Sequence, residues 1–106
     1  MAELDDLKQR LREFADARDW EQFHTPKNLA MALVAEAAEV VEHFQWLTAA
    51  ESQALDADKR AAVALELADV LLYLVMLADR LDVDLGETSR RKIALNEKRF
   101  PPATRL

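Results

Sequence analysis

Four acidic residues stand in two pairs with the same spacing. Glu36 and Glu39 lie three residues apart in one apolar segment, and Glu66 and Asp69 lie three residues apart in another, with 26 residues between the pairs. Positions three apart in an α-helix share one face. If two such helices pack antiparallel, all four carboxylates can meet at one place.

The surroundings of these acids favour a metal site. No Lys or Arg lies between Asn28 and Lys59, nor between Ala61 and Asp79. An acid pair on an ordinary exposed helix is simply solvated, but buried carboxylates without counter-charge are costly and take up protons. Oxygen-only ligands suit a hard cation. We therefore predict a Mg²⁺ site, with Mn²⁺ as a substitute, held by Glu36, Glu39, Glu66 and Asp69.

Two kinds of metal chemistry compete at this point. A di-iron bundle uses Glu-x-x-His twice, from two helices. The chain has one such match, Glu21 to His24, in an irregular stretch before Pro26, and its partner is missing. Mg²⁺ held for phosphate chemistry is the better reading, and it calls for cationic groups and for flat surfaces that can stack a base.

Groups of both kinds are present. Lys92, Asn96 and Arg99 recur at helical spacing on one face, although a basic last turn also simply complements the helix dipole. Trp20 and Trp46 are the only tryptophans and sit at helix ends. Each taken alone is more often core filler, but aromatic faces there can stack a nucleobase. The candidate hydrogen-bonding groups beside them are His24 and Tyr73.

The rest of the pattern predicts the helices that must position these groups. Leucines and a phenylalanine at steps of three or four give a helix over residues 3–18. Thr25 before Pro26 starts a helix that should run from Pro26 to Leu47. Thr48 and Glu51 match a capping box for a short third helix. Asp56 or Asp58 then caps a helix to Leu81, and Asp84 with Glu87 opens a last one that stops before Pro101 and Pro102.

The helix around Glu66 is unusually apolar. Between Ala61 and Ala78, 16 of 18 residues are apolar. A helix apolar all round is buried in a core or a subunit interface. A transmembrane span is the rival reading, but two acids near its middle would each cost roughly 2–4 kcal/mol in a bilayer.

Composition supports an all-α fold: a four-helix bundle plus one short helix, in one domain over residues 1–106. Ala and Leu make up 36 residues, β-branched residues only 12, and glycine occurs once. Without cysteine there is no disulfide framework and no thiolate ligand. A net charge of −6 disfavours nucleic acids and anionic membranes as partners. The acidic N-terminus does not look like a signal peptide, which leads us to expect a cytoplasmic protein.

Taken in order, these motifs resemble the all-α nucleotide pyrophosphohydrolases of the MazG type. The resemblance rests on Glu36-x-x-Glu39, Glu66-x-x-Asp69 and Lys92-x-x-x-Asn96-x-x-Arg99, and spans residues 4–101. The stretch from Arg18 to Asn28 and the triplet Phe44-Gln45-Trp46 are similar to the dCTP pyrophosphatase branch. One departure is alanine, at positions 35 and 38, where such proteins often have glycine beside the motif glutamates.

The resemblance implies Mg²⁺-dependent cleavage of dCTP or a related deoxynucleoside triphosphate between the α and β phosphates. It implies that the four acids are metal ligands, that one glutamate also orients the attacking water, and that Lys92, Asn96 and Arg99 hold phosphates or sugar. The base and sugar pocket would comprise Trp20, His24, Asn28, Trp46 and Tyr73. It also implies a homotetramer built as a dimer of dimers. A broad-specificity or dUTP-directed pyrophosphatase, and a non-catalytic metal-binding oligomerisation module, remain open as alternatives.

Overall fold

A computed structural model describes residues 2–103 of the chain, and every regular element within them is helical. The elements, in order, are α1 (Ala2–Ala17), the 3₁₀ turn η1 (Glu21–Phe23), α2 (Pro26–Glu42), α3 (Ala49–Ser52), α4 (Ala57–Arg80) and α5 (Leu85–Arg99). The predicted all-α class is confirmed, with four main helices and a short one.

The helices begin where side-chain caps were expected. Thr25 caps α2 by accepting a hydrogen bond from a backbone N–H, and Pro26 follows in the first turn. Thr48 and Glu51 form the full capping box at α3. Asp56, rather than Asp58, caps α4, and Asp84 caps α5. Each cap satisfies a backbone donor that the helix leaves unpaired, which fixes the start of the helix.

The predicted end of the second helix was wrong. The helix stops at Glu42 rather than at Leu47. The backbone N–H of His43 already bonds back three residues to Val40, and residues 43–46 form turns. Thr48 adopts an extended conformation (ψ 165°) as the cap of α3, and that conformation cannot continue a helix. Trp46 is therefore carried by a turn between α2 and α3 and not by a helix.

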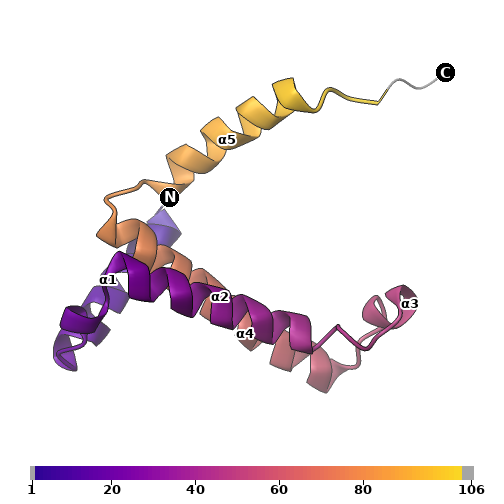
Figure 1. Cartoon of the computed structure of the whole chain (residues 1–106), viewed down its shortest axis with the longest axis horizontal. Helices are drawn as coiled ribbons and strands as arrows, with labels where there is room; N and C mark the ends of the chain where they lie inside the picture. The colour runs from indigo at the N-terminus through magenta and orange to yellow at the C-terminus, as the bar shows by residue number, and fades with distance from the viewer. Residues whose placement is uncertain (1, 104–106) are drawn as a thin grey trace.

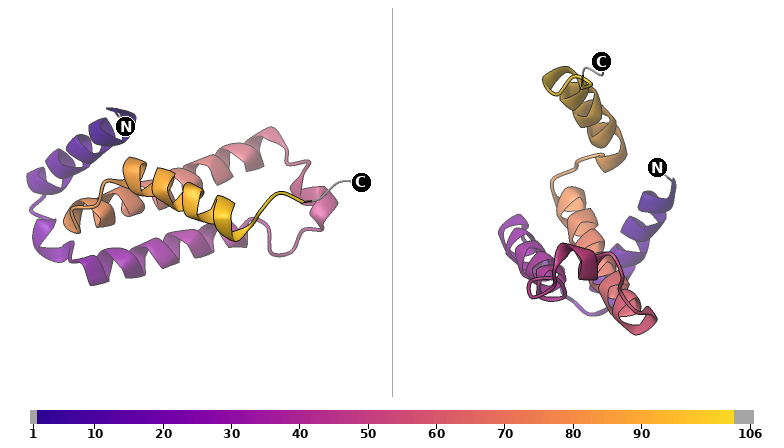
Figure 2. Two further views of the ribbon diagram at one scale, coloured as in Figure 1. Left: turned by 90° about the horizontal axis from the view of Figure 1, so that it is seen from above. Right: turned by 90° about the vertical axis from the view of Figure 1, so that its right-hand side faces the viewer.

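The α2 and α4 helices lie side by side along most of their length, running in opposite directions, and α1 crosses α4 near its C-terminal end (Figures 1 and 2). The buried side chains at these contacts are small or aliphatic. They are Ala15 of α1, Leu29 of α2, and Val63, Val75 and Ala78 of α4. This packing brings the central turns of α2 and α4, which carry the two acid pairs, against each other.

The last helix stands apart from this assembly. Figure 1 and the right-hand view of Figure 2 show α5 projecting away from the α2–α4 pair after the turn that follows α4. Ile93 and Leu95 are 58% and 56% exposed on it. The four main helices of one chain therefore do not close into a complete bundle.

Helix α4 is long and apolar enough to cross a membrane by length and composition. Only 17% of its most apolar window is buried within the chain. Leu65 and Leu67 on α4 are 71% and 54% exposed, and Val34 on α2 is 70% exposed. Single exposed apolar residues are normal, but two adjoining helices with several each form a surface of the kind found at interfaces.

Candidate active site

The four acids of the two pairs meet between α2 and α4. Because each pair lies on one helix face and the helices are antiparallel neighbours, one carboxylate oxygen from each of the four residues lies within 4.8 Å of the others. They are Glu36, Glu39, Glu66 and Asp69. The predicted convergence of the two acid-x-x-acid pairs is confirmed.

Two oxygens in this cluster lack partners. Glu36 and Glu66 are half-buried, and the Oε2 atom of each is shielded from solvent without a hydrogen bond. Buried polar atoms in native proteins are nearly always paired, so an unpaired one calls for an explanation. Among the hydrogen bonds and ion pairs of the described residues, no Lys or Arg neutralises the cluster.

The electrostatics of the cluster point the same way. The pKa of Glu66 is raised to about 7, first by its hydrogen-bonding approach to the Glu39 carboxylate, then by burial and by the nearby negative charges. The pKa of Glu36 is also raised, first by burial and then by the charge of Glu39. Four carboxylates this close do not all ionise readily without a cation.

This donor set fits a hard divalent cation. All four ligands are carboxylates, none is nitrogen or sulfur, and two of the oxygens are buried and free to coordinate. Mg²⁺ and Mn²⁺ accept such oxygen ligands, whereas zinc and di-iron sites typically include histidine or cysteine. The acidic cluster thus has the chemistry of a metal site.

A cavity of about 510 Å³ adjoins the cluster through Asp69. Three of the predicted pocket residues line it: Trp20, His24 and Tyr73. Its other walls come from α1 and α4 and are largely apolar. They are Leu7, Arg10, Leu11, Phe14, Ala15, Leu72 and Met76. An apolar, aromatic cavity with a few polar groups, next to a carboxylate cluster, can hold a flat heterocycle with its charged substituent near the metal ligands.

The aromatic side chains of this cavity support one another. Trp20 meets Phe14 edge to face, with ring centroids 5.6 Å apart, and meets His24 in a similar way at 6.4 Å. Asp19, just before Trp20, has a positive φ of 56°, which turns the chain back at the end of α1. The Trp20 amide then bonds to the carbonyl of Ala15. The Trp20 side chain is therefore placed by local backbone geometry as well as by packing.

The sequence reasoning missed the contribution of α1 to this cavity. Leu7, Leu11 and Phe14 were read only as the apolar stripe of an amphipathic helix, and Arg10 was not considered. Helical periodicity shows that a face is covered, but it does not distinguish a packed core from a cavity wall. No signal in the local sequence would have separated the two.

The remaining predicted site residues lie elsewhere in the chain. The Asn28 side-chain amide donates a hydrogen bond to the Phe23 carbonyl and so ties η1 to the start of α2. Trp46 is 87% exposed beyond the C-terminal end of α2, a helix about 25 Å long, whereas Trp20 lies before the start of that helix. The residues Lys92, Asn96 and Arg99 are on α5, which projects away from the acidic cluster.

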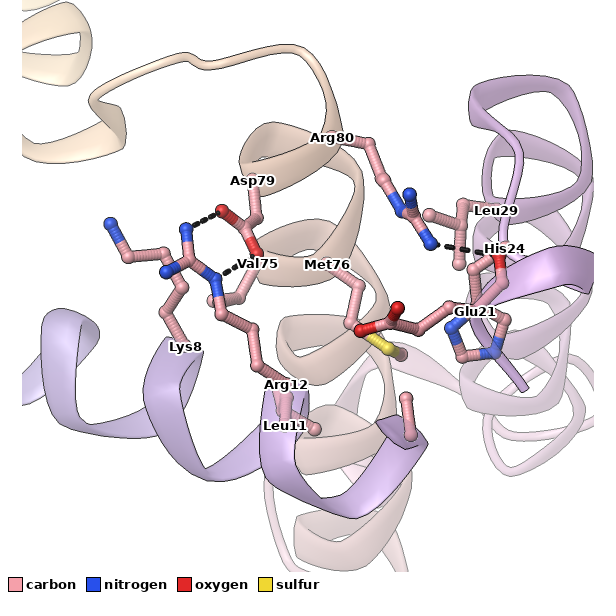
Figure 3. A pocket seen from close by; sticks show the side chains of 11 residues that line it. Lys8, Leu11, Arg12, Glu21, His24, Leu29, Val75, Met76, Asp79 and Arg80 are labelled. Carbon is pink, nitrogen blue, oxygen red and sulfur yellow. Dashed lines mark hydrogen bonds and ion pairs between the residues drawn. The ribbon is translucent and has the colours of Figure 1, made fainter. Parts of the chain in front are cut away.

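A second cavity, of about 320 Å³, is drawn in Figure 3 and adjoins the aromatic cavity, with which it shares Leu11, Ala15, His24 and Met76. Part of its wall is formed by charged residues of α1, η1 and the last turn of α4. These include Lys8, Arg12, Glu21, Asp79 and Arg80. Arg12 binds Asp79 with both ends of its guanidinium, which joins α1 to α4 and holds the pKa of Asp79 below its usual range.

Comparison with known proteins gives a consistent result. The model of the MazG-like family matches residues 31–104. The dCTP pyrophosphatase 1 of Rattus norvegicus is 49% identical over 100 residues, covering 92% of this chain and 59% of that protein. The human protein of the same name is 48% identical over the same shares. The chain thus spans about three fifths of the length of these mammalian relatives.

A solved structure covers nearly the whole chain. The crystal structure of a pyrophosphatase from Archaeoglobus fulgidus DSM 4304 is 39% identical, covers 94% of both chains and superposes with a TM-score of 0.88. The match extends across the apolar helix α4. That helix is therefore a core helix of a soluble fold and not a membrane span.

Proposed function

This chain belongs to the MazG-like family, and we propose that it is a Mg²⁺-dependent pyrophosphohydrolase of nucleoside triphosphates. Its substrate is dCTP or a related, modified deoxynucleoside triphosphate, which it converts to the monophosphate and pyrophosphate. The observation that carries the proposal is that Asp69 belongs both to the four-carboxylate cluster and to the lining of the aromatic cavity, so that the two adjoin.

The acidic cluster has the role of holding Mg²⁺, for which Mn²⁺ can substitute. Glu36, Glu39, Glu66 and Asp69 would be its ligands. The cation supplies charge for the phosphate oxygens and makes a water molecule a better nucleophile. A glutamate of the cluster that keeps one oxygen free can orient that water by accepting its hydrogen bond.

The aromatic cavity has the role of holding the base. Trp20 offers a face for stacking, and His24 and Tyr73 offer hydrogen-bonding groups. The half-buried position of His24 and Tyr73 makes an unpaired base edge costly, so these groups are suited to select among bases. Asn28, in the first turn of α2, supports the same pocket indirectly. Its side-chain amide donates a hydrogen bond to the carbonyl oxygen of Phe23, the residue just before His24.

Phosphate binding requires a second copy of the chain. Lys92, Asn96 and Arg99 lie on α5, away from the cluster of their own chain, and Trp46 is almost fully exposed. The uncovered apolar residues of α2 and α4 offer a surface on which another chain can pack. We propose a homotetramer, built as a dimer of dimers, in which α5 and Trp46 complete the site of a neighbouring subunit.

The cellular role that fits these features is nucleotide-pool house-cleaning in the cytoplasm. The net charge of −6 and the acidic cluster do not suit nucleic-acid binding, whereas a small anionic nucleotide brought in with Mg²⁺ matches the site.

The deciding experiment is pyrophosphate release from a panel of nucleoside triphosphates with purified protein and Mg²⁺. The panel includes dCTP, 5-substituted dCTP, dUTP, dTTP, dATP, dGTP and the ribonucleotides. Fastest turnover of dCTP or its modified form supports the proposal. A preference for dUTP, or equal turnover of all members, would replace it with the dUTP-directed or broad-specificity reading.

Absence of turnover for every nucleotide would leave a metal-binding oligomerisation module. In that case Asp69→Asn would change only thermal stability. A preparation with bound iron and its visible absorption would instead indicate a di-iron protein.

A further inference from the structure

The cavity that receives the base depends on a short turn with little stability of its own. The η1 turn is three residues long and lacks a side-chain cap at its start. It nevertheless carries both polar and aromatic pocket groups, since Trp20 precedes it and His24 follows it. A turn of this length must be fixed by contacts from outside if those side chains are to keep one orientation.

One such contact comes from a residue that is remote in the sequence. Arg80, in the last turn of α4, donates from Nη2 to the carbonyl oxygen of Glu21 at 2.8 Å, across 59 residues of sequence. The same carbonyl accepts the backbone N–H of His24 at 3.1 Å. The Arg80 side chain and the His24 amide therefore bind the same carbonyl oxygen, and Arg80 fixes the peptide group to which His24 is hydrogen-bonded (Figure 3).

The last turn of α4, which carries Arg80, is itself held in place by a second contact. Its neighbour Asp79 extends in the opposite direction and pairs with Arg12 of α1, with Nε to Oδ2 at 2.8 Å. The last turn of α4 thus binds α1 on one side and η1 on the other. Phe14 of α1 and Trp20, the residue just before η1, meet edge to face, and both line the base cavity.

Arg80 does not line the base cavity itself. Arg80 lines the smaller charged cavity, whereas Trp20 and Tyr73 line the larger aromatic one, and His24 borders both. From this geometry we infer that Arg80 is a positioning residue, which acts on substrate through η1 by holding His24 and Trp20 in their orientation toward the base. The inference rests on the proposed function, because it concerns the cavity assigned there to the base.

The kinetic consequence follows from the location of the turn. The base is remote from the phosphates, so a loosened turn weakens binding of substrate and transition state about equally. Arg80→Ala should raise KM for the preferred nucleotide about tenfold, the loss expected for one charge-assisted hydrogen bond, and change kcat by no more than about twofold. The ratio of KM values between preferred and poor bases should shrink.

The matched variants separate positioning from charge or folding. Arg80→Lys keeps one cationic donor, so its KM should lie close to the wild-type value. Arg60→Ala removes an exposed arginine from the other end of α4 and should behave as wild type. An Arg80→Ala protein with unchanged KM, or with kcat lost at constant KM, would overturn the inference, and so would a lower Tm with normal kinetics.

Hydrogen exchange supplies a readout that needs no turnover. In Arg80→Ala, the His24 amide and its neighbours in residues 20–24 should exchange faster, while the central turns of α2 and α4 keep their protection. Unchanged exchange in the turn would overturn the inference whatever the activity. If the wild-type protein hydrolyses no nucleotide, the proposed function fails while this measurement still decides whether Arg80 holds the turn.

Discussion

Glu36 of α2 and Glu66 of α4, 30 residues apart in the sequence, each direct a buried oxygen without a hydrogen-bond partner into the same small cluster of carboxylates. Neighbouring charges and burial raise the pKa of both groups. The fold therefore keeps like charges together at a cost to its own stability. Such a cost is typical of a functional site, and it leads to predictions about the metal-free and the metal-loaded protein.

Replacing Glu66 with Gln should have opposite effects on the stability of the metal-free protein and on catalysis. Removal of one charge relieves repulsion, so the Tm in EDTA should rise. The increase in Tm on adding Mg²⁺ should largely vanish, and turnover should fall by at least about a hundredfold because metal-held charge stabilises the transition state. Calorimetry measures the change in Tm, and pyrophosphate release measures the turnover.

The control is Glu42→Gln, because Glu42 is exposed on α2 and lies outside the cluster. A Glu66→Gln protein that responds to Mg²⁺ like wild type would contradict the metal assignment.

The Mg²⁺ effect on stability should depend on pH in a defined direction. Glu66 has a folded-state pKa of about 7 against an ordinary value of 4.5. The folded metal-free protein thus keeps a proton that the unfolded chain releases, and this stabilisation, full below about pH 4.5, is lost as the pH rises through about 7. Because Mg²⁺ competes with that proton, the difference in Tm between Mg²⁺ and EDTA should grow from pH 5 to pH 8. A constant difference over this range would argue against coordination by Glu66.

Changes in the aromatic cavity should alter base selection more than chemistry. Tyr73→Phe removes one hydroxyl at the cavity wall. The differences in kcat/KM between nucleotides with different bases should therefore become smaller, with kcat nearly constant. Trp20→Ala removes the stacking face and should raise KM about tenfold, as expected for loss of one base–aromatic contact. Steady-state kinetics over the nucleotide panel test both. Phe23→Ala, an exposed aromatic in the same turn, is the matched control.

Mixing two inactive variants tests whether a site is shared between subunits. If Lys92 serves a neighbour's cluster, Glu66→Gln and Lys92→Ala chains are each inactive alone, but a mixed dimer has one intact site. Random reassembly of equal amounts should then recover about a quarter of wild-type activity, since half the dimers are mixed and half their sites are intact. Light scattering should show a mass near four times 12.0 kDa. No recovery from the mixture would mean that Lys92 acts within its own chain, and a Lys92→Ala chain active by itself would mean that Lys92 has no part in the site.

Much of this protein follows from local rules in its sequence. Helix starts at Thr25, Thr48, Asp56 and Asp84 were predictable because capping is a contact between residues three positions apart. The end of α2 was not, because it depends on how the chain must turn to reach the next cap. The acid pairs were readable because helix periodicity alone puts residues three apart on one face.

Other features required the packed structure. That two acid pairs form one cluster depends on the antiparallel contact of α2 and α4, and that α1 lines the base cavity depends on its crossing of α4. The hydrogen bond from Arg80 to the Glu21 carbonyl joins residues 59 positions apart, and no spacing rule connects such positions. Sequence by itself determined which residues could share a helix face, because that is set within a few residues along the chain. Which faces meet was decided only by tertiary packing, because burial and long-range contacts join segments that are remote in the sequence.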